Sequence, residues 1–245
     1  SLHDALPIST SGPGATNLVT GIANAMMDSI PMVCLTGNVN SWAIGKDAFQ
    51  ETDIQGITIP ITKHNYLVTD VNDLPYVLAE AFYLANTGRK GPVLVDIPKD
   101  VFQKMTSNPF PTEIHRRGYQ LPPDPDPAQI ATAVAMIEAA QRPVLIAGAG
   151  VLWGEAFDEL KTFAETNDIP VINSLLGLGT FPRDHELSLG MMGMHGEATG
   201  TLAVQAADLV IDMAEGRSKV LNAKAEDRSE ETRLNSSHRC LSRMP

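Results

Sequence analysis

Two short apolar runs decide the fold of the first part of this chain: residues 31–37, PMVCLTG, and residues 92–97, PVLVDI. Each is a continuous apolar stretch next to proline or glycine, which is typical of a strand buried on both faces of a parallel sheet. Helical periodicity occurs at residues 17–27 and 74–86, and Gly88 stands at a natural position for the end of the second helix. Strands that alternate with helices predict parallel βαβ winding and an α/β fold.

The same alternation returns in the second half of the chain, and it predicts a second α/β domain over residues 128–218. Two glycine-containing loops lie within it, LLGLGTF at residues 175–181 and GMMGMHG at residues 190–196. Helices alternate with strands, in the order helix, strand, helix, strand, helix, strand, at residues 128–140, 144–148, 154–167, 169–173, 198–207 and 208–212.

A proline-rich segment separates the two predicted domains. Residues 109–127 contain six prolines with polar and charged residues between them. Because proline fixes φ, we expect a semi-rigid linker there, with the first domain covering residues 9–108.

Both ends of the chain have a composition unlike the rest. Residues 5–8, ALPI, and residues 228–231, RSEE, can be encoded by strings that overlap as reverse complements and resemble a common sequencing adapter. Residues 219–245 also lack a strand run or a sustained amphipathic period. We therefore predict that residues 1–8 are a non-native leader and that residues 219–245 are a disordered, non-native tail.

Composition excludes several classes of protein. The net charge of −11 would repel the phosphates of a nucleic acid, and no apolar run reaches membrane-spanning length. The two cysteines are too few for a disulfide framework, and Cys34 lies inside an apolar run, so we expect a protein of the reducing cytoplasm.

Two loop motifs have the residue types of a binding site. In TSGPGATN at residues 10–17, Gly12 and Gly14 allow the backbone to approach a ligand or a neighbouring segment closely, just before a helix. In GKDAFQE at residues 45–51, Phe49 offers a hydrophobic wall and Gln50 both donates and accepts hydrogen bonds. Asp47 and Glu51 fit equally well as solvated loop carboxylates.

Together the motifs carry a resemblance. TSGPGATN, then TGNV, AIGKDAFQE and TGRKGPVLVDIPKDV, resemble in order and spacing the pyrimidine-binding domain of the acetolactate synthase family. In the second domain GAGVL, GLGTF and GMHG resemble the central, FAD-holding domain of that family. The resemblance implies a partial pyrimidine-binding domain followed by a partial Rossmann-like central domain, each a parallel sheet flanked by helices.

The resemblance also implies roles for particular residues. Phe49 and Gln50 would line the active site, and Lys99 would lie at the substrate-access channel across a subunit interface. Arg89 would contact FAD as a fixed cation. The remaining cofactor contacts that it implies, with no metal ligand among them, are Gly12, Gly14, Gly148, Ala149, Gly150, Met194, His195 and Gly196.

The implied reaction joins two pyruvates, or pyruvate and 2-oxobutyrate, with loss of CO₂ in branched-chain amino-acid biosynthesis. Its cofactors would be thiamine diphosphate, Mg²⁺ and FAD. In the family, a homodimer or homotetramer carries it out, with a possible small regulatory subunit. The family's activating glutamate and its Mg²⁺ motif have no counterpart in these residues, so we expect this chain by itself to be an inactive fragment.

Two alternatives remain open at this point. One is an NAD-dependent dehydrogenase, because Gly148, Gly150 and Gly154 form a weak nucleotide fingerprint after a strand. Against it, the next strand ends in Asn173 and lacks an acidic residue for the ribose. The other is a different thiamine-diphosphate enzyme, such as glyoxylate carboligase, pyruvate oxidase or the FAD-free catabolic acetolactate synthase.

Overall fold

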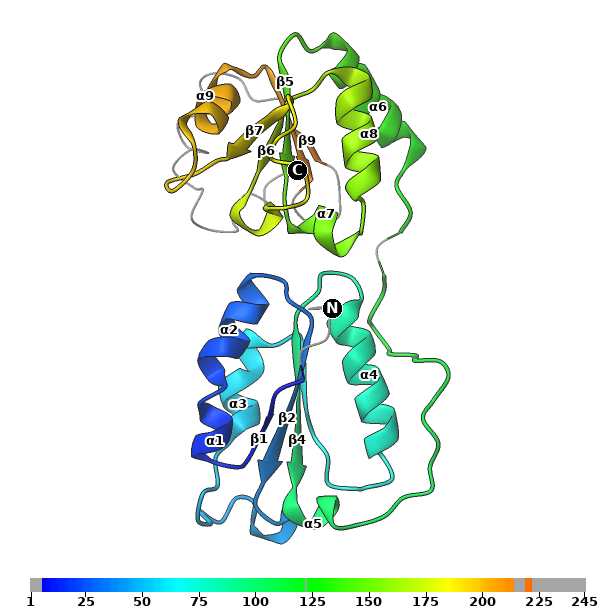
Figure 1. Cartoon of the computed structure of the whole chain (residues 1–245). Coiled ribbons are helices and arrows are strands. Elements are labelled where there is room, and N and C mark those ends of the chain that lie inside the picture. The colour runs from blue at the N-terminus through cyan, green and yellow to red at the C-terminus, as the bar shows by residue number, and fades with distance from the viewer. Residues whose placement is uncertain (1–5, 122, 214–218, 222–245) are drawn as a thin grey trace. The chain divides into compact units, whose positions relative to one another are not determined.

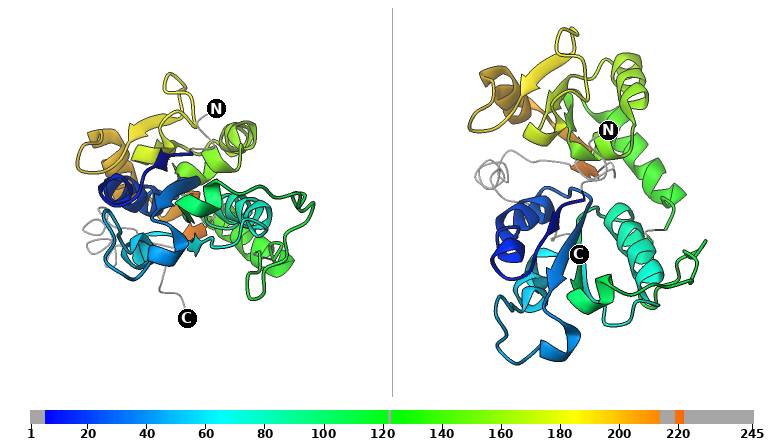
Figure 2. Two further views of the ribbon diagram at one scale, coloured as in Figure 1. Left: turned by 90° about the horizontal axis from the view of Figure 1, so that it is seen from below. Right: turned by 60° about the horizontal axis from the view of Figure 1, so that its bottom comes forward.

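The chain folds into two compact units, residues 1–123 and residues 124–245. The computed structural model describes residues 6–121, 123–213 and, for the backbone alone, 219–221. Each unit is a twisted sheet with helices on both faces (Figure 1, Figure 2). The predicted α/β class is therefore confirmed for both halves of the chain.

The first unit contains a four-stranded, fully parallel sheet in the order β1-β2-β4-β3. Thr36 of β2 stands opposite Asp96 of β4 in this register. The strand β4 is buried along its whole length, as its apolar sequence predicts. The strands are β1 (Ile8–Ser9), β2 (Met32–Asn38), β3 (His64–Leu67) and β4 (Pro92–Pro98).

Helices cover the two faces of this sheet. On one face Ile22 and Ile54 pack on Cys34 and Leu94, and on the other face Leu84 packs with the valines of β4. The helices on the first face are α1 (Pro13–Thr16), α2 (Val19–Met27) and α3 (Ile54–Thr58), and α4 (Leu74–Asn86) covers the second (Figure 1). The short α5 (Lys99–Phe102) and the 3₁₀ turns η1 (Ser41–Ala43) and η2 (Ile59–Ile61) lie in the connections.

The predicted strands at 31–37 and 92–97 and the predicted helix at 74–86 are confirmed. The helix predicted over 17–27 begins at Val19, because the residues before it form the separate turn α1. Sequence periodicity missed β3 and α3, which are too short to show a period.

The structure departs most from the sequence prediction in the proline-rich segment, which we predicted to be a linker. Residues 103–121, which we call the strap, run along the outer side of α4 (Figure 1). The hydroxyl of Tyr119 donates to the carbonyl of Thr87 at 2.9 Å, and the Asn108 amide donates to the carbonyl of Asn72 at 2.9 Å. Most of the proline-rich segment is therefore fastened to the first unit, because the side chains between its prolines reach α4 and the turn before it.

The second unit contains a five-stranded sheet in the order β7-β6-β5-β8-β9. Its strands are parallel except β9, which pairs antiparallel with β8. The strands are β5 (Pro143–Ala147), β6 (Val171–Asn173), β7 (Ser188–Met191), β8 (Leu209–Met213) and β9 (Lys219–Leu221).

Strand β9 corrects one expectation from the sequence. We expected no strand after residue 218, but residues 219–221 pair antiparallel with β8. An edge strand has unpaired backbone N–H and C=O groups, so another segment can pair with it through its backbone alone. The rest of the predicted tail, residues 222–245, and residues 1–5 of the predicted leader lie outside the described residues. Within the predicted leader, Ile8 belongs to β1.

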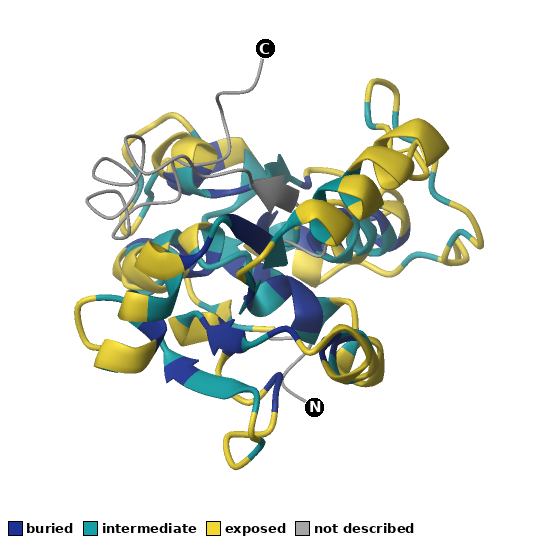
Figure 3. Ribbon diagram, turned by 90° about the horizontal axis from the view of Figure 1, so that it is seen from above, coloured by how far each residue is buried: buried dark blue, intermediate teal, exposed yellow. Residues whose placement is uncertain are grey.

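The helices of the second unit also lie on two faces. Helices α6 and α8 cover one face, where Leu160 and Ala164 of α8 pack on Leu145 and Ile211 of the sheet. Helix α9 covers the other face (Figure 1). Buried residues concentrate in the strands and exposed ones on the outer sides of the helices (Figure 3). The helices are α6 (Pro127–Ala139), α7 (Ala149–Trp153), α8 (Phe157–Asn167) and α9 (Ala198–Ala206), with the 3₁₀ turn η3 (Leu175–Gly177).

The helix predicted over residues 154–167 starts later, at Phe157, and a separate helix, α7, precedes it. Glu155 between them has a φ of 53°, which breaks the helical path.

A substitution at Arg116 tests how firmly the strap is held. Arg116 pairs with Glu80 at 3.0 Å, and the Glu80 side chain is only 6% exposed. Arg116→Ala would leave a buried carboxylate without its cation, so we expect urea unfolding of the first unit to show a loss of about 3 kcal/mol. The exposed neighbour is the control: Arg117→Ala should stay within about 0.5 kcal/mol of the parent. Equal losses in the two variants would contradict this account.

Candidate functional site

The candidate site lies at the carboxyl edge of the first sheet. Because its strands are parallel, the loops that follow them all leave at this edge, where open α/β sheets bind ligands. After β1, Gly12 is the N-cap of α1 and Gly14 lies in its first turn. The loop after β2 contains Phe49 and Gln50, and Lys99 begins the helix after β4.

Gly12 brings the first two loops into contact. Its φ is +58°, and a Cβ atom placed on it would lie 2.7 Å from the carbonyl oxygen of Gln50. A Cβ on Gly14 would lie 2.6 Å from Cγ2 of Thr10, so this glycine serves the turn itself. Gln50 also has a positive φ, of 64°, and the Phe49 side chain is 88% exposed. The structure thus joins Gly12 to Gln50 and presents Phe49 outward at the same edge.

Glu51 organises the loop that presents Phe49 and Gln50. Its carboxylate accepts hydrogen bonds from the backbone N–H groups of Gly45 and Ala48. These bonds, that of Gly45 foremost, hold the pKa of Glu51 below its usual value. Glu51 is therefore a positioning residue, which the sequence alone did not distinguish from a solvated carboxylate.

Asp96 is a site residue that the sequence analysis missed. It accepts hydrogen bonds from the Thr36 hydroxyl at 2.7 Å and from the Asn38 amide, and it is 1% exposed. Burial raises its pKa to about 6, against the lowering effect of these two hydrogen bonds. It lines a cavity of about 280 Å³ together with Glu51 and Gln55. The signal was present in PVLVDI, where a carboxylate interrupts a buried apolar strand.

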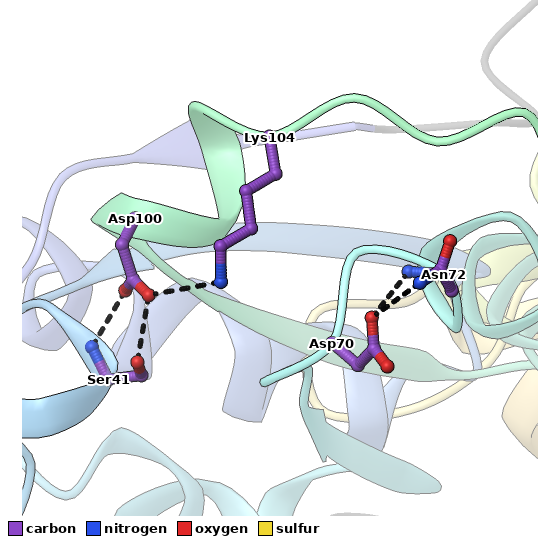
Figure 4. A network of polar contacts seen from close by, with 5 residues as sticks. All are labelled: Ser41, Asp70, Asn72, Asp100 and Lys104. Carbon is purple, nitrogen blue, oxygen red and sulfur yellow. Dashed lines mark hydrogen bonds and ion pairs between the residues drawn. The ribbon is translucent and has the colours of Figure 1, made fainter.

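Lys99 is exposed at the start of α5. Its neighbour Asp100 is held by several hydrogen bonds (Figure 4). Asp100 accepts from the backbone N–H of Ser41 at 2.7 Å and from its hydroxyl at 2.8 Å. These bonds hold the pKa of Asp100 low, and Lys104 lies 3.5 Å from the same carboxylate. The loop after β2 is thereby tied to the helix that carries Lys99. The Asp70–Asn72 turn in the same view is a separate feature.

Arg89 lies apart from the other predicted site residues of the first unit. It precedes β4, at the amino end of the sheet, and its Nε donates to the Ser29 hydroxyl at 2.9 Å. Its Nη2 donates to the carbonyls of Met26 and Met27, so the guanidinium caps the carboxyl end of α2.

A second group of predicted residues lies at the carboxyl edge of the second sheet. Gly148 is the N-cap of α7, directly after β5. A Cβ on Gly177 would collide with the carbonyl of Ala147, so the loop after β6 packs tightly on the turn after β5. The amide of buried Asn173 donates to the Gly177 carbonyl at 2.7 Å. Strand order reverses beside β5, where open α/β sheets form a ligand crevice.

Met194, His195 and Gly196 lie in the loop after β7. Met194 is 88% exposed, and His195 is also exposed. Gly196 has no room for a side chain, because a Cβ there would collide with the carbonyl of Met191. These residues share the carboxyl edge with residues 148–150, and β6 lies between the two strands that carry them.

Within the described residues, no group of three or more His, Cys, Asp or Glu side chains could hold a metal ion.

Gly12 can be tested with a matched glycine. Gly12→Ala forces a side chain into the left-handed region and against Gln50, so urea unfolding should show a loss of about 2 kcal/mol. Gly21→Ala is the control, because nothing lies within 4 Å of a Cβ at this exposed helical position. It should raise stability by about 0.5–1 kcal/mol. A Gly12→Ala variant as stable as Gly21→Ala would rule out the close approach.

The lowered pKa of Glu51 predicts that the stability of its loop depends on pH. Because its pKa is lower in the folded loop than its ordinary value of 4.5, its contribution to stability is complete above 4.5 and is lost as the pH falls through the folded value. In an NMR titration, the Gly45 amide resonance should move with a midpoint below 4.5. The movement should vanish in Glu51→Gln and persist in Asp47→Asn; the reverse pattern would refute the assignment.

Comparisons with known proteins agree with this layout. Residues 5–57 match the model of the thiamine pyrophosphate enzyme N-terminal TPP-binding domain, and residues 130–224 match that of the thiamine pyrophosphate enzyme central domain. The first match begins at residue 5, inside the segment that we predicted to be a non-native leader.

Curated relatives are similar over most of this chain. The acetolactate synthase large subunit of Corynebacterium glutamicum is 55% identical over 204 residues, which are 83% of this chain and 33% of that protein. The acetolactate synthase of Mycobacterium bovis is 52% identical over the same shares, and the chloroplastic acetolactate synthase of Arabidopsis thaliana is 48% identical over 83% of this chain and 30% of its own length. The chain spans about a third of the length of these relatives. Two domain models of the thiamine pyrophosphate enzymes match this chain in order, and the chain therefore belongs to that family.

Proposed function

We propose that this chain carries part of the active site of an acetolactate synthase, which joins two pyruvates, or pyruvate and 2-oxobutyrate, and releases CO₂. The observation that carries the proposal is the contact of Gly12 with Gln50, because it brings two distant motifs together at one sheet edge. The names of the relatives support the reaction, since the bacterial and plant proteins cited above are all called acetolactate synthases.

We assign the substrate-facing roles to Phe49, Gln50 and Lys99. Lys99 is an exposed cation at this edge and would attract the carboxylate of a 2-oxo acid. The amide of Gln50 can orient a substrate oxygen, and Phe49 would exclude water when a second surface covers it. Thiamine diphosphate, when bound, supplies the stabilisation of the carbanion.

We also assign an FAD site to the second unit. The turn at residues 148–150 follows β5 at the reversal of strand order, and its glycines let a ligand approach the backbone. Residues 194–196 lie at the same edge and would complete that site. Arg89 remains a proposed FAD contact through its charge, although its guanidinium is bonded to the end of α2 in this structure.

For partners, we propose a homodimer or homotetramer with a small regulatory subunit. Several relatives are named as large subunits, which supports a smaller companion. None of the described helices has both the length and the apolar character that a bilayer span requires. We propose a cytoplasmic location, which suits Cys34: burial raises the pKa of this thiol to about 12 and makes it unreactive.

The NAD-dependent alternative is disfavoured by Asn173, the last residue of β6. An NAD site of this kind has an acidic residue there to bind the ribose, but the Asn173 amide donates to Gly177 and Thr180. Another thiamine-diphosphate enzyme would share the fold, and the product of the reaction separates it from an acetolactate synthase.

A chimera tests the proposal. Residues 9–212 of this chain would replace the matching segment of the Corynebacterium glutamicum enzyme, and acetolactate formation from pyruvate would be measured. We expect activity, and we expect Lys99→Met to lower kcat/KM at least about 10-fold through loss of a charged contact. Lys104→Met, at an exposed lysine just beyond the end of α5, should change it less than about twofold.

Two results would contradict the proposal. One is a folded, cofactor-loaded chimera that consumes pyruvate without forming acetolactate, as a pyruvate oxidase would. The other is an equal loss of activity in Lys99→Met and Lys104→Met, which would remove Lys99 from the substrate-facing residues.

A further inference from the structure

A partly buried polar cluster helps to anchor the strap. Arg116 donates from Nη1 to the carboxylate of Glu80 at 3.0 Å, and its Nη2 lies 3.1 Å from Nε2 of His64. The hydroxyl of Tyr66 donates to the same carboxylate of Glu80, and the ring of Tyr66 meets His64 edge-on, with centroids 4.5 Å apart. One strap side chain is thus held between the edge strand β3 and α4.

The contact between Arg116 and His64 depends on the charge of the imidazole. A guanidinium only donates hydrogen bonds, so Nε2 of His64 must accept, and the ring must be neutral. Protonation of Nε2 would remove the acceptor and place two cations about 3 Å apart in a partly buried site. The single negative charge of Glu80 can balance only one of these two cations, and Arg116 is already paired with it.

The other groups around His64 do not relieve this conflict. Tyr66 stays protonated, because burial and the Glu80 carboxylate raise its pKa. The titratable side chains of α4 are Tyr76, Glu80 and Tyr83. Tyr76 donates to the carbonyl of His115 on the strap, and the ring of Tyr83 meets Tyr119 of the strap edge-on. On this face β4 contributes only the apolar side chains of Val93, Val95 and Ile97 to the core. His115 and its partner Glu113 point to solvent, with side chains 88% and 79% exposed.

We propose that His64, Arg116 and Glu80 form a pH-operated latch, which holds the strap on α4 while His64 is neutral and releases it when His64 is protonated. This device is independent of the proposed catalytic function. It acts on the segment that connects the two units, since α6 of the second unit begins shortly after the strap.

The direction of the pH dependence follows from linkage. Burial first, and then Arg116, lower the pKa of His64 below its ordinary value of 6.5, while Glu80 opposes them. Well above 6.5 the imidazole is neutral in both the closed and the open strap, so the titration of His64 does not affect the latch there. Below 6.5 His64 is protonated in the open strap but still neutral in the closed strap. The fraction of open strap therefore rises until the pH falls below the pKa of His64 in the closed state.

Release of residues 115–119 would lengthen the connection between the units. While Tyr119 is held, the free chain to Asp126 spans at most about 25 Å. With the next anchor at Asn108, the same connection could span about 60 Å at full extension. Acidification would therefore give the second unit a much longer tether.

Hydrogen exchange followed by mass spectrometry on the whole 245-residue chain tests the latch. Exchange of the peptide that covers residues 112–121 would be measured at pH 7.5, 6.5 and 5.5 and corrected for the intrinsic rate. In the parent chain we expect a change of less than about twofold between 7.5 and 6.5, and a rise in the opening constant of up to about fivefold between 6.5 and 5.5.

Three variants make the result specific. His64→Gln keeps an acceptor without a titrating group, so its strap should stay closed within about twofold at every pH. His115→Gln removes the exposed strap histidine and should respond like the parent. Arg116→Gln removes the cation, so its strap should be open already at pH 7.5 and change little with pH; this variant decides the matter if His64→Gln fails to fold.

The proposal is overturned if the parent strap does not open between pH 6.5 and 5.5. It is also overturned if His64→Gln or Arg116→Gln shows the same rise as the parent, because the titrating group would then lie elsewhere. Loss of the rise in His115→Gln would assign the effect to that histidine instead.

Discussion

The candidate site depends on a close approach of two backbone segments at Gly12. The carbonyl of Gln50 lies where any side chain on residue 12 would have to be, and Gly12 itself has a φ that side chains disfavour. This contact sets the position of the loop after β2 relative to the turn after β1. Phe49 and Gln50 are thereby placed at the same edge of the sheet as Gly12, where they can share a surface for a ligand.

Carboxylates fasten the loops around this contact. Glu51 gathers the backbone amides of its own loop, Asp96 orients Asn38, and Asp100 binds Ser41. The second unit uses the same device, where Asp208 accepts from the backbone N–H groups of Gln141 and Arg142 at 2.8 and 2.9 Å. Part of the net charge of −11 therefore serves to position loops, since an ionised carboxylate bonds two amides more strongly than a neutral acceptor does.

Long, strongly patterned elements could be predicted from the sequence, and short ones could not. The apolar run of β4 and the helical period of α4 are local signals, because burial on both faces or on one stripe is written in consecutive residues. Strand β3 has only the four residues HNYL, and the reason it is a strand lies in its pairing with β4. The strap was taken for a linker because prolines mark irregular backbone, whether or not that backbone packs on a helix.

The sequence by itself determined the two α/β units and carried the resemblance to the family, because apolar periodicity and glycine-rich motifs are local properties. Only the tertiary structure decided which residues meet. It joined Gly12 to Gln50, placed Arg89 at the opposite end of the sheet, and set Arg116 between Glu80 and His64. Such contacts depend on strand order and register, which bring together residues that no local pattern connects.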